Sequence, residues 1–257
     1  MRRALALILA LSMTILMCAC GSSAVKDAET AINEIGEVTT DSLEQITKAE
    51  KLYNLLTDAE KGKVKNRLAL VEAREEFDKL QKAIIYDNAK KAYEELNAVA
   101  DLCVKGMDDI YGAWYYGIYK LKDHNYDMYY WFASETPHLS QSDLEKAASD
   151  LGFSETLVRS DWQYCLYVAE TALANKGVYD DVNDKMADSL SILQELTETY
   201  NDYEYYPKLK EYYAKVSSYV EFFNSPSGSF KQLADTINDY ENNIRTYQTD
   251  VGFLFSK

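Results

Sequence analysis

An apolar stripe of unusual length constrains this chain more than any other feature of its sequence. From Arg67 to about Lys122, apolar residues recur at intervals of three and four, which is the spacing of one face of an α-helix. The stripe comprises Leu70, Ala73, Phe77, Leu80, Ile84, Ala92, Leu96, Val99, Cys103, Met107, Ile110 and Trp114. Because the whole chain of 257 residues has only 10 Gly and 3 Pro, few positions interrupt such helices. The sequence therefore predicts an all-α protein.

Shorter segments with the same spacing precede this stripe. The pattern predicts a helix over about residues 26–35, a second that opens with a capping box of Asp41 and Glu44, and a third that opens with Thr57 and Glu60. Their inner faces are expected to hold Leu43, Ile46, Ala49, Tyr53 and Leu56, followed by Val64, Leu68, Val71 and Phe77. We therefore expect a small three-helix module over residues 26–82.

Residues 83–257 are expected to form a larger antiparallel helical bundle of about four helices. The segment 123–140 loses the periodicity and is expected to be a loop, followed by a short helix over about 143–151. Ser154 is expected to cap one helix that continues to Gly177. Three further helices follow, with stripes over 182–196, 209–223 and 230–254. The spacing slips near Ile84, so a continuous long helix is expected to join the module to the bundle at a fixed distance.

The first 19 residues have the composition of an export signal. Two arginines at the start precede an apolar run from Ala4 to Met17, and its length of about 14 residues suits a signal core and is short for a membrane span. The following Ala19-Cys20-Gly21-Ser22 resembles the lipobox of bacterial lipoproteins, although Met17 stands where leucine is most usual in that family.

The lipobox resemblance implies a membrane anchor at Cys20. Cleavage would leave Cys20 as the new N-terminus with a diacylglyceryl group on its thiol, and residues 20–25 would be a tether. Cys18 is a poorer candidate because bulky Met17 would precede it. The alternatives are an ordinary secretory signal and an uncleaved anchor. Attachment through lipid would place the chain on the cell membrane, facing outside the cytoplasm.

The three-helix module resembles a helical element that recurs in large surface proteins of Gram-positive bacteria. The likeness covers about residues 25–81 and rests on turn and apolar residues together, among them Ile35-Gly36, Ile46, Ala49, Leu56-Thr57 and Val64. It implies a spacer or adhesive unit with no catalysis attached.

The net charge of −15 limits the partners of the chain. Loss of Arg2 and Arg3 with the signal would make the mature chain still more acidic. Such a chain repels phosphate backbones and anionic lipid, so we expect no nucleic-acid partner and no membrane contact apart from the N-terminal lipid.

An aromatic-rich region over residues 111–140 is the strongest candidate for a ligand or partner surface. Tyr111, Trp114, Tyr115 and Tyr119 follow one another so closely that we do not expect all four to face one core, and some of their rings should lie exposed. The candidate surface comprises Tyr111, Trp114, Tyr115, Tyr119, Tyr129 and Trp131. The alternative is an aromatic core with a loop packed over one end of the bundle. On the same helix, Gly106, Gly112 and Gly117 indicate a close approach of another segment, or a local break.

Two cysteines, Cys103 and Cys165, remain in the body of the chain. An exported location permits a disulfide between them, and the alternative is a pair of buried free thiols. The sequence leaves both open.

No pattern of residues identifies a catalytic, cofactor or metal site. Asp123 to Asp127 begins like a calcium loop, but Met128 and Ser134 stand where glycine and the bidentate glutamate are required. We expect His124 and His138 to be solvated loop residues, and adjacent acidic pairs such as Asp108-Asp109 to lie on a solvated face.

These observations favour a non-enzymatic, lipid-anchored protein of the cell surface that presents its bundle to a protein or a glycan. An extracytoplasmic receptor that binds a small molecule or a peptide through the aromatic region is the alternative. A cell-wall-associated enzyme is a third hypothesis.

Overall fold

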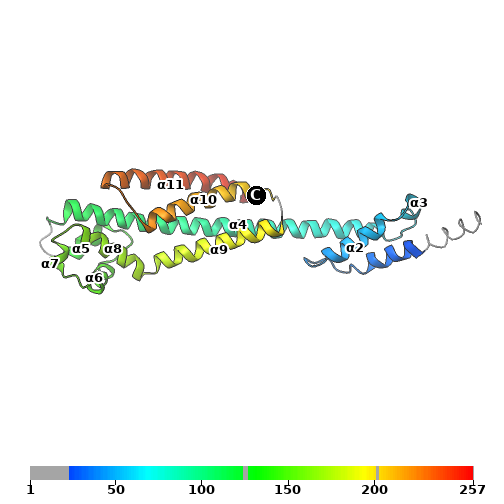
Figure 1. Cartoon of the computed structure of the whole chain (residues 1–257), viewed down its shortest axis with the longest axis horizontal. Helices are drawn as coiled ribbons and strands as arrows, with labels where there is room; N and C mark the ends of the chain where they lie inside the picture. Colours follow the sequence, from blue (N-terminus) through cyan, green and yellow to red (C-terminus); the bar gives the residue numbers. More distant parts are fainter. Residues whose placement is uncertain (1–22, 124–126, 201–202, 257) are drawn as a thin grey trace, which may run out of the picture. The chain divides into compact units, whose positions relative to one another are not determined.

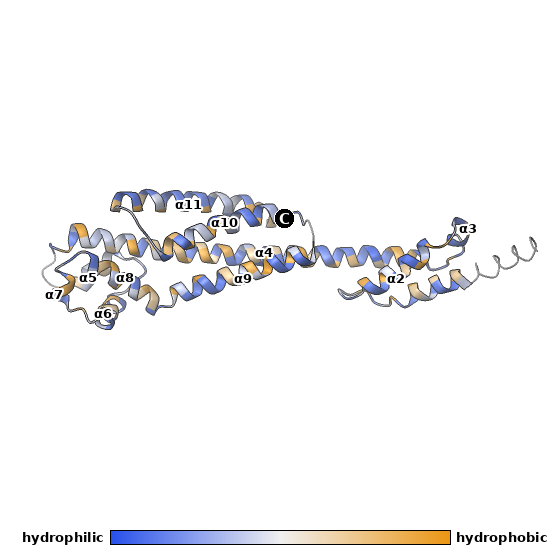
Figure 2. Cartoon of the chain, viewed as in Figure 1, coloured by the Kyte–Doolittle hydropathy of each residue, from blue (hydrophilic) through white to orange (hydrophobic). Residues whose placement is uncertain are grey.

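The computed structural model describes residues 23–123, 127–200 and 203–256. This part of the chain consists of helices and turns and contains no strand, which confirms the all-α prediction. The chain divides into two compact units, one that ends at Ile84 and one that begins at Ile85. Apolar residues recur among hydrophilic ones along the helices of both units (Figure 2).

Three helical segments and the start of a fourth build the N-terminal unit. Residues 23–33 are helical, and they are followed by α2 (Leu43–Asn54), α3 (Asp58–Lys61) and the beginning of α4 (Arg67–Tyr115). The core of this unit consists of Val25, Ala28, Ala31, Ile32, Ile35, Ile46, Ala49, Leu56, Val64, Leu70, Ala73 and Phe77. Asn66 fixes the turn before α4 to the first helix, because its Nδ2 donates to the Glu29 carbonyl and to Asn33 Oδ1, both at 2.8 Å.

The structure confirms one of the two predicted capping boxes of this unit and corrects the other. The Thr57 N–H donates to Glu60 Oε2 at 2.9 Å at the start of α3. Asp41 does not cap α2, since the helix begins one residue later than predicted, after Ser42.

The inner face after α3 also differs from the prediction. The side chains of Leu68 and Val71 are 73% and 43% exposed, whereas Leu70 and Ala73 are buried. Helix α3 ends after one turn, and α4 begins as a separate helix at Arg67. The buried face of α4 therefore does not continue the face predicted for α3. In α2, Leu43 is likewise exposed while Ile46 and Ala49 are buried.

The C-terminal unit is an antiparallel bundle of four long helices with a group of short helices at one end (Figure 1). Its long helices are α4 from Ile85 onwards, α9 (Val178–Thr199), α10 (Tyr206–Asn224) and α11 (Phe230–Gly252). The chain direction reverses from each of these helices to the next (Figure 1). After Tyr115, α4 widens into a π-helical turn over Tyr116–Lys120, in which the Leu121 N–H donates to the Tyr116 carbonyl at 2.9 Å.

The short helices are α5 (Met128–Glu135), α6 (Gln141–Asp150), α7 (Glu155–Val158) and α8 (Gln163–Asn175). The prediction of a loop over 123–140 is wrong because this segment contains α5, which buries Met128 and Phe132 one turn apart. The single helix predicted from Ser154 to Gly177 is in fact α7 and α8, with a break between them. Ser154 does cap α7, since its Oγ accepts the Leu157 N–H at 3.2 Å.

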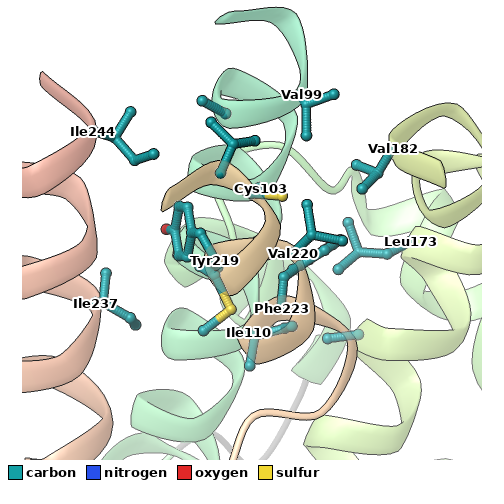
Figure 3. Packing of buried hydrophobic residues seen from close by; sticks show 14 of the residues in the cluster. Val99, Cys103, Ile110, Leu173, Val182, Tyr219, Val220, Phe223, Ile237 and Ile244 are labelled. Atoms are coloured by element: carbon teal, nitrogen blue, oxygen red, sulfur yellow. The ribbon is translucent and has the colours of Figure 1, made fainter. Parts of the chain in front are cut away.

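Close packing against α4 explains its three glycines, as the sequence indicates. A Cβ atom on Gly106 would overlap the ring of Phe223 from α10, and one on Gly112 would overlap the carbonyl oxygen of Glu135 at the end of α5. A Cβ atom on Gly117 would lie 2.8 Å from the carbonyl oxygen of Trp162. Figure 3 shows the core beside this face of α4, where Phe223 and Val220 of α10 meet Cys103 and Ile110.

Candidate functional site

Four of the six predicted surface aromatics gather around Phe230, the first residue of α11. The ring of Tyr111 stacks on Phe230 with centroids 4.9 Å apart, and Tyr119, Trp114 and Tyr115 lie 5.6, 6.2 and 6.3 Å from it. We call these five residues the Phe230 cluster. The four rings turn to the same side of the helix, but they do not all face the core, since Trp114 is buried while Tyr111 and Tyr115 are half-buried. The expectation that some rings lie exposed is met by Tyr119, which is 55% exposed.

The inner side of the Phe230 cluster is held by a pair of indoles. Trp114 is 9% exposed and stacks on Trp162, which lies just before α8, with centroids 5.7 Å apart and ring planes 9° apart. Gly117 makes this contact feasible, since it allows the Trp162 backbone to approach the end of α4. The cluster therefore has a rigid base and an exposed rim.

The other two predicted aromatics, Tyr129 and Trp131, lie on α5. Tyr129 is half-buried, and burial raises the pKa of its hydroxyl to about 12. Trp131 is 36% exposed and meets the exposed ring of Tyr130 edge-on at 5.3 Å. Exposed aromatic side chains thus occur both on α5 and at the end of α4.

A surface groove of about 280 Å³ lies beside the Phe230 cluster, between α4 and α11. We call it the acidic groove; it is lined by Asp108, Tyr111, Ala234, Ile237, Asn238 and Glu241. Tyr111 belongs to both features, so the groove and the cluster are continuous. The sequence alone does not reveal this groove, because the residues of its two walls lie more than 120 positions apart in the chain.

The two carboxylates of the acidic groove influence each other. Burial raises the pKa of Glu241 above its usual range, and the charge of Asp108 raises it further. Arg245 opposes this effect, since its Nη2 lies 3.3 Å from Glu241 Oε2, but the Arg245 side chain is 72% exposed. On the other wall, Asp108 Oδ2 lies 3.8 Å from His138 Nε2.

A buried hydroxyl lies behind the groove. Tyr219 of α10 has no exposed surface, and its ring stacks on Tyr240 of α11 with centroids 5.1 Å apart. Its hydroxyl has no hydrogen-bond partner among the residues that the structure describes. The hydroxyl points towards α11 between Ile237 and Ile244, the stretch that carries Glu241 (Figure 3). Burial, followed by the nearby Glu241, Cys103 and Asp108, raises the pKa of Tyr219.

Asp109 departs from the prediction that the pair Asp108-Asp109 lies on a solvated face. Its side chain is fully buried, and its Oδ1 accepts the backbone N–H of His138 at 2.9 Å. Burial raises the pKa of Asp109 to about 6, and the contact with His138 offsets only part of this shift. Asp109 thereby attaches the turn after α5 to α4. The sequence contains one indication that Asp109 is buried, which is its position between Gly106 and Gly112. Small residues on either side allow another segment to approach the helix and cover an acidic side chain.

The two histidines were predicted to be solvated. The His138 side chain is 39% exposed, and its backbone is held by Asp109. His124 lies outside the described residues, as do two further positions of the incomplete calcium pattern. Within the described ranges, no three His, Cys, Asp or Glu side chains are placed to hold a metal ion.

Cys103 and Cys165 are free, so the structure corrects the disulfide alternative in favour of two buried thiols. Both have no exposed surface, and burial raises the pKa of each thiol to about 12. A thiol with such a pKa is not ionised at neutral pH and is a poor nucleophile. The two cysteines therefore serve as core side chains.

Two further grooves lie outside this region. One of about 440 Å³ lies between α9 and α10 and is mainly apolar; its lining includes Leu190, Leu193, Tyr206 and Tyr213. The other, of about 300 Å³, lies in the N-terminal unit next to the ion pair in which Arg74 Nη2 lies 2.6 Å from Glu50 Oε2.

The predicted lipid-attachment residue, Cys20, lies outside the described residues. Among the helices that are described, none is both long enough and apolar enough to cross a membrane. The chain matches no protein-family model, and no curated protein or solved structure shows significant similarity to it.

Proposed function

We propose that this chain is a non-enzymatic protein of the outer cell surface, attached to the membrane by lipid at Cys20, whose helical bundle contacts a protein or glycan partner. Membrane attachment is supported by the export signal and the Ala19-Cys20-Gly21 sequence. The partner contact is supported by the Phe230 cluster, and this is the observation on which the proposal depends.

The Phe230 cluster has the properties of a contact surface. Its rings are fixed by stacking on one another and on Trp162, so little side-chain freedom would be lost on binding. Tyr119 offers a half-exposed ring with a hydroxyl at its edge, and such rings serve both protein and sugar contacts. Ile118, next to Tyr119 in the sequence, is 38% exposed and adds a second exposed apolar side chain to this turn.

The test compares two exposed tyrosines of the same unit. Mature chain without lipid, residues 21–257, is mixed with isolated cell envelopes of the source bacterium, which are then sedimented. Tyr119→Ala should reduce the amount of chain bound by about tenfold, as expected when an aromatic side chain that contributes strongly to an interface is truncated. Tyr167→Ala, which removes a 48% exposed ring from α8, should have little effect.

Two results would contradict this proposal. One is binding to envelopes that is equal for wild type and Tyr119→Ala. The other is turnover of an envelope component by the purified chain that a single substitution abolishes.

A receptor for a small molecule or peptide is the second candidate function. It is favoured by the acidic groove, whose volume of about 280 Å³ suits a small ligand and whose rim includes the Tyr111 ring. A ligand there would touch the Phe230 cluster through Tyr111, so the two functions share one region of the molecule.

A further inference from the structure

The acidic groove brings two carboxylates together from opposite walls. Asp108 comes from α4 and Glu241 from α11, and Ile237 and Ala234 supply apolar lining between them and the rest of the groove. Like charges placed in this way repel each other, and the repulsion is larger where water is partly excluded. A cation bound between them would remove that repulsion.

The ion pairs already present do not fill this role. Arg245 reaches Glu241 from one turn further along the same helix, and its guanidinium remains in solvent. The Glu241 side chain is 16% exposed, so the protein covers most of it, whereas the Asp108 side chain is 48% exposed. His138 lies 3.8 Å from Asp108, beyond hydrogen-bond distance, and is charged only when protonated.

Tyr219 gives a second and independent indication of a ligand. A fully buried hydroxyl without a partner is costly and is uncommon in folded proteins. This hydroxyl points towards the part of α11 that lines the groove (Figure 3). It is thus an unused hydrogen-bonding group that lies behind the lining of the groove, within electrostatic range of Glu241 and Asp108.

We propose that the acidic groove binds an organic cation, an alkylammonium or alkylguanidinium group, between Asp108 and Glu241. The proposal rests on the binding role of the bundle and names the chemistry that one part of it recognises. The alkyl stem would lie on Ile237 and Ala234, and the Tyr111 ring would face the cation from the rim. The Asn238 side-chain carbonyl would accept an N–H group that the carboxylates leave unpaired, and the Tyr219 hydroxyl would support the Glu241 carboxylate from behind the groove.

The chemistry of the groove selects an organic cation over a metal ion. The two carboxylates are supported by an amide and a phenol, and the described residues offer no third His, Cys, Asp or Glu ligand at the site. The volume of about 280 Å³ matches a side-chain-sized group better than a bare ion. The net charge of −15 would attract cations from solution towards the chain.

The experiment measures binding of three small compounds of equal length by calorimetry and by the shift in thermal midpoint. They are n-butylammonium, n-butylguanidinium and, as the neutral control, n-butanol. Both cations should bind and raise the midpoint, and n-butanol should not. Binding should weaken as salt is added, because the attraction is between charges.

Three variants test whether the cations bind in the acidic groove. Glu241→Gln should weaken binding by about tenfold, since it removes one charge of the pair. Asp235→Asn removes an equal charge from an exposed position on the same helix and should change binding by less than about twofold. Tyr219→Phe should weaken binding by about threefold without lowering the thermal midpoint of the free chain, because its hydroxyl has no partner to lose.

A capped peptide with a single arginine between glycines and serines distinguishes the two sources of such a cation. If it binds about tenfold more tightly than n-butylguanidinium, the natural ligand is a side chain of a partner protein; equal affinity indicates a free amine or guanidine. The proposal is overturned if n-butanol binds as well as the cations, or if Glu241→Gln binds them as well as wild type. That outcome would leave the effect of Tyr119→Ala on envelope binding untouched, so the proposed function is tested separately.

Discussion

Asp109 shows how one side chain can set both a local contact and a pH response. Its carboxylate is buried on α4, where it accepts the His138 N–H and holds the turn after α5. The charged groups around it are Asp108 on its own helix, His138 on the turn and Lys176 after α8. Burial outweighs the attraction of His138 and Lys176, so the folded chain holds a proton on this carboxyl more tightly than the unfolded chain does.

Asp109→Asn should therefore flatten part of the pH dependence of stability. The folded pKa of about 6 exceeds the ordinary value of 3.8, so this group adds stability as the pH falls from above 6 towards 4. Relative to the variant, wild type should gain about 2–3 kcal/mol between about pH 7 and about pH 4, from about 1.4 kcal/mol per pKa unit. Urea denaturation at both pH values measures the difference. Parallel curves for wild type and variant would contradict the argument, and Asp235→Asn is the exposed control.

Gly112 is the residue at which a single added methyl group should matter most. Its missing Cβ leaves room for the Glu135 carbonyl, and backbone at the end of α5 cannot move aside as a flexible side chain can. Gly112→Ala should cost more than about 2 kcal/mol of stability, measured by thermal denaturation. Gly62→Ala places its Cβ 3.8 Å from the nearest atom and should stay within about 1 kcal/mol of wild type. Equal midpoints for the two variants would show that α5 does not approach α4 so closely.

At the scale of elements, helix starts could be predicted where a capping side chain is unambiguous. Thr57, Ser154 and Pro207 each stand at the start of a helix, as expected from their preferences for these positions. The prediction failed at Asp41 because Ser42, next to it, occupies the position before α2.

The starts of helices α2 and α3 provide a matched test of which side chains cap a helix. Thr57→Ala removes the hydroxyl that donates to the Glu60 carboxylate at the start of α3 but keeps the backbone N–H that does the same, and should cost about 1 kcal/mol. Asp41→Ala removes a side chain that makes no cap and should change stability by less than about 0.5 kcal/mol. Hydrogen exchange of the amides in residues 43–66 measures both. An equal loss of protection in the two variants would contradict the assignment of the caps.

The long stripes of α4 and α11 could be predicted because each has one wide inner face. Helix α5 could not be predicted, because only Met128 and Phe132 of its eight residues are buried. Two apolar positions are too few to show a helical periodicity. The break between α7 and α8 was missed because Val158 and Cys165, on either side of it, keep helical spacing although the chain between them is not helical.

The candidate site was predicted only on its α4 side. Tyr111, Trp114, Tyr115 and Tyr119 were identified from their density in the sequence, but their common partner Phe230 comes from the start of α11. The acidic groove depends in the same way on which helices become neighbours. Such pairings are set by tertiary packing, and local patterns do not encode them.

At the scale of the whole molecule, the N-terminal cysteines determine where the chain would reside. If Cys20 carries the lipid, Cys20→Ser should abolish lipid attachment and leave the protein free to pass into the culture medium. Cys18→Ser should leave the protein on the membrane, since on this proposal Cys18 would lie in the segment removed with the signal. Immunoblots of membrane and medium fractions measure the partition. Release of both variants, or of neither, would contradict attachment through Cys20.

The stacked indoles of Trp114 and Trp162 also make the folding of this protein visible by spectroscopy. Fixed aromatic packing produces near-ultraviolet circular dichroism, which disappears when side chains become mobile even if helices persist. One ring belongs to α4 and the other to the turn before α8, so this signal would report the docking of the short helices on the bundle. Helix content would be followed separately in the far ultraviolet. The two wavelengths together would reveal whether the end of the bundle loosens before its long helices melt.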